Sequence, residues 1–241
     1  MKHSQLSVTL LALVLVLTAL LSSCGARLVS IVPEENDLFR NAKTGATYQV
    51  LPASYEPISR GEEYGRLDQS GVEFVLHEMP GRSTDEWLCS VYGDVYCRSD
   101  YEFVPFADWE ISALYVCTNT ALVVSELTIK PSAIQSEALC DRLYGLLKAA
   151  YAEGEGVYYP SYATPSRAYT LRFESEDMPG VYFCVKMIEY TEDIFEGETN
   201  LGRTFLYDRY ADRCVAVSDV LFRMLDGETL EAVMGAEVDG E

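Results

Sequence analysis

The feature that most constrains this fold is a series of short segments rich in β-branched and aromatic residues, each bounded by turn residues. Such segments are typical of β-strands. Connections as short as Pro80-Gly81 and Gly93-Asp94 cannot hold a crossover helix, so the strands around them are predicted to pair antiparallel. The predicted strands are residues 48–51, 72–79, 86–92, 95–98, 111–118, 121–130, 169–174, 181–190, 204–209 and 214–217.

One main helix is predicted over residues 132–151, so we expect an α+β fold with a mostly antiparallel sheet packed by this helix. Ser132 and Gln135 have the spacing of a capping box, in which both side chains satisfy free backbone amides. Apolar residues then recur every three or four positions until Gly154 ends the pattern. We expect this helix to be a structural element and not a binding site. Two shorter helices are predicted, at residues 219–225 and 228–234.

Both halves of the chain contain a Met-Pro-Gly turn, at Met79–Gly81 and Met178–Gly180, followed by strands, a serine cap and a helix. The two turns and the two caps are separated by different intervals, so no fixed period relates the halves. Two interpretations remain open, a pair of similar β-rich halves and independent use of the same turn chemistry. We expect a tether over residues 24–43 and then a single domain over 44–241, with a sub-boundary near 153–166.

The N-terminus has the three parts of a secretory signal peptide, namely a positive start at Lys2, an apolar stretch over residues 6–21, and small residues before Cys24. The sequence Leu21-Ser22-Ser23-Cys24 resembles a bacterial lipobox, which reads aliphatic, small, small, cysteine. The resemblance to bacterial lipoproteins implies that cleavage removes residues 1–23 and that the Cys24 sulfur carries a diacylglycerol anchor with fatty acids such as palmitate. Two acyl chains of ~15 methylenes contribute on the order of 20 kcal/mol of membrane affinity. The expected location is the cell membrane, lipid-anchored and facing outside the cytoplasm.

Two other interpretations of this leader were weighed against the lipoprotein. An uncleaved transmembrane helix is disfavoured because residues 6–21 are fewer than the roughly 20 needed to span a bilayer. In addition, no cluster of Lys or Arg follows the apolar stretch. An ordinary cleaved signal would make Cys24 a chance neighbour of the cleavage site.

The composition excludes several classes of protein. A formal net charge of −20 argues against nucleic acid as a partner, because phosphate binding requires a basic face. A hydrophobic content of 49% with 12% aromatic residues excludes a disordered chain. The negative charge is compatible with a basic peptide or a divalent cation as partner, and equally with a charge that only keeps the domain soluble.

Cysteine spacing predicts a hairpin bridge. Cys89 and Cys97 flank the turn at Gly93-Asp94, and we expect them to pair across it if the loop length sets them opposite each other. An even number of cysteines besides Cys24 permits such bridges outside the cytoplasm. The alternative is that the cysteines are small buried apolar residues. No CxxC motif is present, so a zinc site is not expected.

Catalytic motifs are absent from the sequence. His77 is the only histidine after the leader, and it is not part of an HExxH motif. Neither a GxSxG nucleophile elbow nor a phosphate-binding glycine loop is present. The acidic residues over 192–200 offer oxygen ligands without the spacing of an EF-hand, so a solvated acidic hairpin tip is expected there. We therefore predict no catalytic residue, no metal site and no cofactor.

The tyrosines around two prolines form the candidate interaction surface. Tyr158, Tyr159 and Tyr162 lie in a segment stiffened by Pro160 and Pro165, and Tyr is enriched at interfaces. The predicted function is therefore a non-enzymatic binding module for a protein, peptide or glycan. The alternatives are an inhibitor or immunity-type protein and a hydrolase of envelope polymers. A deep cleft that holds His77 with two carboxylates would favour the hydrolase.

Overall fold

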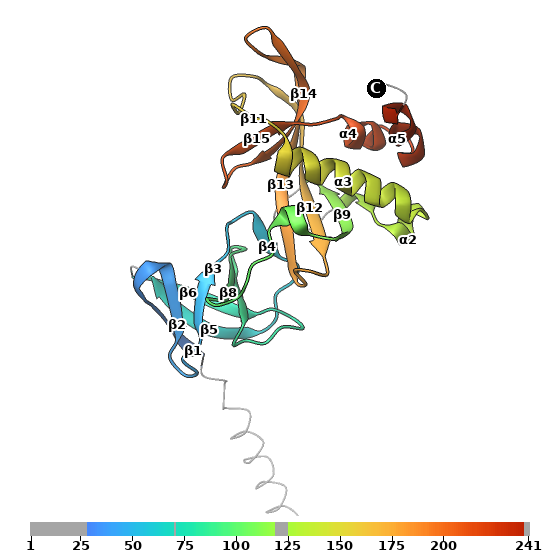
Figure 1. Ribbon diagram of the computed structural model, residues 1–241. Helices are drawn as coiled ribbons and strands as arrows, with labels where there is room; N and C mark the ends of the chain where they lie inside the picture. The colour runs from blue at the N-terminus through green and yellow to red at the C-terminus, as the bar shows by residue number, and fades with distance from the viewer. Residues whose placement is uncertain (1–27, 70, 119–124, 239–241) are drawn as a thin grey trace, which may run out of the picture.

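The computed structural model describes residues 28–69, 71–118 and 125–238, with side chains described as far as residue 235. Two β-rich lobes follow each other along the chain, and a shared hydrophobic core joins them (Figure 1). The N-terminal lobe is a closed barrel, and the C-terminal lobe is a large sheet with helices. The predicted α+β fold with mainly antiparallel pairing is confirmed.

The barrel lobe closes in the order β1-β2-β3-β8-β7-β6-β5. Its closure depends on a parallel pair between β1 and β5, whereas the other neighbours pair antiparallel. Seven buried apolar side chains fill the interior. The strands are β1 (Val29–Pro33), β2 (Leu38–Asn41), β3 (Thr47–Val50), β5 (Glu63–Gln69), β6 (Val72–Glu78), β7 (Trp87–Ser90) and β8 (Val95–Arg98), with a short 3-10 helix η1 (Glu35–Asp37) between β1 and β2.

The sheet of the second lobe runs in the order β10-β9-β12-β13-β14-β15-β11. The long antiparallel meander of β12, β13 and β14 forms its centre. A short strand from the connection between the lobes, β4 (Tyr55–Pro57), also pairs with β13. The other strands are β9 (Ile111–Cys117), β10 (Ser125–Ile129), β11 (Gly156–Val157), β12 (Pro165–Ser175), β13 (Val181–Glu196), β14 (Thr199–Asp208) and β15 (Arg213–Ala216).

Helix α3 (Glu137–Glu153) lies across one face of this sheet and buries Leu143 and Leu147 against it (Figure 1). As predicted, this helix is a packing element. The remaining helical elements are η2 (Phe106–Asp108), α2 (Pro131–Ile134), α4 (Val220–Leu225) and α5 (Leu230–Val238).

The predicted single helix over 132–151 is two helices in the structure. Gln135 has a left-handed backbone (φ 60°) and ends α2, so the predicted capping box does not form. Ser136 is the actual cap of α3, because its hydroxyl accepts from the Leu139 amide at 3.3 Å. The apolar spacing therefore located the helix, but it gave no sign of the break before it.

Strand alternation explains how the lobes share a core. Along β7 and β8, Leu88 and Tyr96 face the barrel interior, whereas Trp87, Cys89, Val95 and Cys97 belong to the core shared with the sheet lobe. The two Met-Pro-Gly turns meet at the same junction, where the Arg82 Nε donates to the Pro179 carbonyl oxygen at 2.8 Å.

Three predictions about organisation are corrected by the structure. The segment 24–43 is not a tether in its described part, because β1 and β2 place Ile31 and Phe39 in the barrel interior. The acidic segment 192–200 is the tip of the β13–β14 hairpin, as expected, but both strands extend further into it than predicted and turn at Gly197 (φ 62°). The two halves are not similar β-rich units, because one is a closed barrel and the other an open sheet.

Candidate functional site

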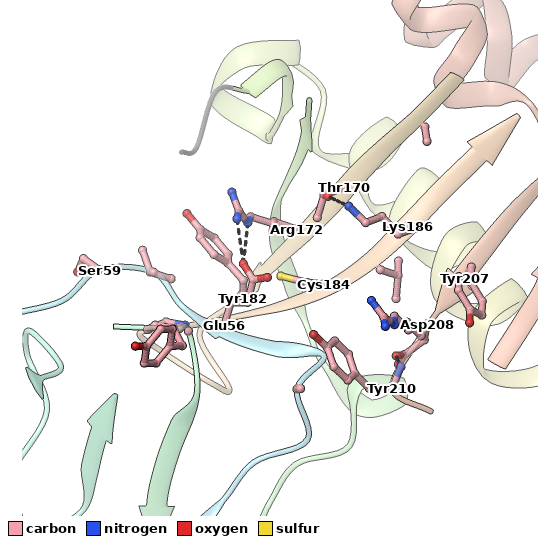
Figure 2. A pocket seen from close by; sticks show the side chains of 18 of the residues that line it. Glu56, Ser59, Thr170, Arg172, Tyr182, Cys184, Lys186, Tyr207, Asp208 and Tyr210 are labelled. Carbon is pink, nitrogen blue, oxygen red and sulfur yellow. Dashed lines mark hydrogen bonds and ion pairs between the residues drawn. The ribbon is translucent and has the colours of Figure 1, made fainter. Parts of the chain in front are cut away.

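A groove of about 1350 Å³ separates the barrel from the sheet face that α3 leaves uncovered. The barrel side is formed by the connection that follows β4 and by the turn between β7 and β8. The sheet side is formed by β12, β13 and the end of β14 (Figure 2). The groove therefore exists only where the two lobes meet.

Strand alternation also gives the sheet side of the groove its polar character. On β12, Leu171 and Phe173 point into the core beneath α3, and the intervening Arg172 lines the groove. On β13, Val185 belongs to the core and Lys186 lines the groove. A side-chain period of two thus places basic residues on the uncovered face of an otherwise apolar sheet.

Arg172 forms the base of the groove, and its side chain is only 4% exposed. Its Nη2 donates to the Glu56 Oε2 at 2.9 Å, as the dashed lines in Figure 2 show. Its guanidinium carbon also lies 5.9 Å from the centroid of the Tyr182 ring. Because Glu56 is on β4, this ion pair fastens the connection between the lobes to the central strands.

Lys186 is partly buried beside this pair. Its Nζ donates to the Thr170 Oγ1 at 2.8 Å (Figure 2). Burial lowers the pKa of the Lys186 ammonium, although the nearby charge of Glu56 acts in the opposite direction. In the part of the chain that the structure describes, no carboxylate lies within ion-pair distance of Lys186.

The carboxylates of the groove are bound to other protein groups. Both Asp208 oxygens accept from the Ser54 hydroxyl at 2.7 and 2.8 Å, and Oδ2 also accepts from the Tyr151 hydroxyl at 2.8 Å. Glu56 is held by Arg172 as described. His77 lines the same groove, with its Nδ1 3.1 Å from the Gly61 carbonyl oxygen. The groove therefore holds the three groups that a hydrolase would use, but both carboxylates serve structural contacts.

Cys184 also lines the groove, and burial raises the pKa of its thiol well above the ordinary value. Such a thiol stays protonated at neutral pH and is a poor nucleophile. Its contribution to the groove is therefore a small apolar surface.

The predicted hairpin of Cys89 and Cys97 forms, but with a different register. Cys89 lies opposite Val95, and Cys97 lies opposite Trp87. The Ser90 amide donates to the Asp94 carbonyl oxygen at 2.9 Å, so the loop is residues 91–93, one residue earlier than the three-residue loop that would set the cysteines opposite each other. Both cysteines are free and buried in the structure, as are the other described cysteines. Burial raises the pKa of Cys89 to about 11.

The three predicted interface tyrosines have different surroundings. Tyr158 is 79% exposed and Tyr162 is 72% exposed. Tyr159 instead stacks on Tyr207, with ring centroids 4.1 Å apart, and both rings line the groove. The predicted tyrosines therefore contribute one edge of the groove through Tyr159, whereas its basic side chains, Arg172 and Lys186, were not among the predicted site residues.

Residues 1–23 and Cys24 lie outside the described residues. Within the described part, no helix has the length and apolar character needed to cross a bilayer. The same part holds no group of three His, Cys, Asp or Glu side chains arranged for a metal ion.

Comparisons with models of known protein families, with curated proteins and with solved structures found no match to this chain.

Proposed function

We propose that this protein is a lipid-anchored, non-enzymatic bacterial lipoprotein that binds a segment of a protein, peptide or glycan in the groove between its lobes. The groove is the observation that carries this proposal. Its volume of about 1350 Å³ exceeds the roughly 300–1,000 Å³ of ordinary small-ligand pockets, so it suits part of a larger molecule. Its carboxylates are already engaged by Arg172, Ser54 and Tyr151, which leaves the surface suited to recognition.

The lipobox sequence supports the location outside the cytoplasm. Leu21-Ser22-Ser23-Cys24 follows an apolar leader, and Cys24 is the residue that would carry the lipid. Metabolic labelling with an alkyne fatty acid tests this assignment. The wild type and a Cys214→Ala control should be labelled, and Cys24→Ala should not. Equal labelling of Cys24→Ala and the wild type would reject the anchor.

Photo-crosslinking in living cells tests the groove. A benzoylphenylalanine placed at Ala168, which lines the groove, should give a defined adduct with the ligand. The matched control places the same group at Ala149, which is exposed on α3 on the other side of the sheet. Adducts at Ala149 only, or identical adducts at both sites, would contradict a ligand in the groove.

A further inference from the structure

The charge of the groove is opposite to the charge of the protein. The chain has 38 acidic residues and 18 Lys and Arg residues, and its formal net charge is −20. The groove is lined by more basic than acidic side chains, namely Arg60, Arg172, Lys186 and Arg209 against Glu56 and Asp208. A basic groove in an acidic protein concentrates the field of its cations between two low-dielectric walls.

Three of these cations form no ion pair with the described carboxylates. Among the described residues, Arg60, Lys186 and Arg209 form no ion pair, although acidic residues outnumber basic ones in the chain. Elsewhere on the molecule most described arginines are paired with a carboxylate, namely Arg40, Arg66, Arg98, Arg167, Arg203 and Arg223. Three described cations without an ion pair therefore line the same groove, where a ligand has access to them.

Lys186 is the cation for which an anion would gain most. Its ammonium is partly buried, and among the described residues its hydrogen-bond partner is the Thr170 hydroxyl at 2.8 Å. Removing a charge from water without an ion-pair partner is unfavourable, and burial accordingly lowers the pKa of Lys186 against the opposing effect of the Glu56 charge. A carboxylate placed beside this ammonium would restore the lost electrostatic stabilisation.

Exposed aromatic rings lie on both sides of the groove. Tyr92 is 75% exposed in the turn between β7 and β8 of the barrel, and Tyr210 is 65% exposed after β14 of the sheet. Tyr and Arg are the residues most enriched at protein interfaces. Clustered basic side chains are also the usual means of recognising acidic peptide motifs.

We propose that the groove binds an acidic, aromatic-containing peptide segment of a partner protein, with one carboxylate on Lys186 and others near Arg60 and Arg209. This inference rests on the proposed function and specifies the ligand of the same groove. The proposed acidic ligand is the opposite of what the net charge alone predicts, because a net charge of −20 favours a basic partner.

The test measures binding of a labelled peptide that alternates Glu and Tyr to the full-length protein in detergent, by fluorescence anisotropy at several salt concentrations. Binding should weaken as salt rises. Lys186→Met should weaken binding about tenfold or more, since it removes a partly buried partner of the carboxylate. Lys130→Met, which removes the same charge from an exposed site before α2, is the matched control and should leave the affinity unchanged.

Thermal unfolding of each variant verifies that it is folded. If Lys186→Met does not fold, Arg209→Gln serves in its place, because Arg209 is exposed in the turn after β14. Equal affinity of the wild type and the folded groove variant would overturn the proposal. A preference for a peptide that alternates Lys and Tyr, or binding of polygalacturonate without binding of the acidic peptide, would also overturn it.

The variant Ala168→Trp distinguishes a wrong choice of ligand from a wrong assignment of the groove as a binding site. The indole should fill the groove next to β13, because Ala168 lies opposite Ile188 and both line the groove. If the Lys peptide or polygalacturonate binds and Ala168→Trp abolishes that binding, the groove is a ligand site and only the acidic peptide is wrong. If Ala168→Trp changes the binding of none of these probes, both proposals fail.

Discussion

In the barrel, β7 and β8 carry apolar side chains on both faces, whereas in the sheet lobe β12 and β13 are apolar towards α3 and carry polar side chains such as Arg172 and Lys186 among apolar ones on the other face. The barrel strands need two apolar faces because one face fills the barrel and the other packs on the second lobe. In the sheet strands, α3 covers one face, whereas the other face is packed only in part, by a smaller apolar cluster that includes Ile188 and Phe205. The comparison shows that a ligand surface arises where a sheet has a face that packing uses only in part.

Replacing Trp87 by Ala should give the largest loss of stability, because this side chain is fully buried in the core that joins the lobes. We expect a loss of about 3–5 kcal/mol in urea unfolding. The transition should remain single, since both lobes depend on the shared core. Two separate transitions in the wild type would show that the barrel and the sheet unfold independently.

Leu143→Ala should cost about 2–4 kcal/mol, because it opens a cavity between α3 and the sheet. Leu146→Ala, one turn along on a half-buried position, is the control and should cost less. Chemical denaturation of both variants measures the difference. An unchanged midpoint for Leu143→Ala would mean that this helix face is not a packing surface.

Raising the pH should destabilise both lobes through buried thiols. Burial raises the pKa of Cys89 and of Cys214 to about 11 from an ordinary 9.0. A pKa that is higher in the folded state favours the protonated form there, so this stabilisation is complete below pH 9 and is lost between pH 9 and 11. Each thiol should account for on the order of 2 kcal/mol of that loss.

Denaturation curves at pH 8 and 11 measure this effect. The double variant Cys89→Ala, Cys214→Ala should lose less free energy of unfolding between these two pH values than the wild type. Tyr48 and Tyr96, whose pKa burial raises to about 12, extend the loss towards pH 12 by the same reasoning. A stability that rises from pH 9 to 11 would contradict the buried thiols.

Changing Tyr158 and Tyr162 to Ser should have the smallest effect on stability, within about 0.5 kcal/mol, because both rings are exposed. Tyr159→Ser should cost more, since it removes the stack on Tyr207. Calorimetry of the two variants distinguishes a solvent-exposed edge from a packed one. Equal losses would mean that the three rings act as one packed unit.

Much of the fold followed from local patterns, and the misses have identifiable causes. β8 has the predicted bounds Val95–Arg98, because Val95 and Tyr96 are strong strand formers between clear turns. β5 was missed because Glu63, Arg66 and Asp68 on its outer side obscure Leu67, which is fully buried in the barrel. Because only one face of β5 is buried, the charged residues of its exposed face interrupt the apolar pattern that would identify a strand.

The groove could not be predicted, since it depends on pairings distant in sequence. β1 pairs with β5, and β4 pairs with β13, and neither contact leaves a local pattern. Lys186 did leave a signal in the sequence. It lies between the apolar Val185 and Met187, and a lysine in a central strand is not at a sheet edge where its ammonium would be solvated. Such a residue should be examined as a candidate ligand contact in other sheets.

The barrel begins at Val29, very close in sequence to the proposed lipidation site at Cys24. At roughly 3.4 Å per residue, the chain between them reaches at most about 17 Å. A lipid on Cys24 would therefore hold the barrel near the bilayer surface, because the segment between them is too short to extend across the cell envelope. The acidic segment that we propose as ligand would then have to be presented within about one protein diameter of the membrane.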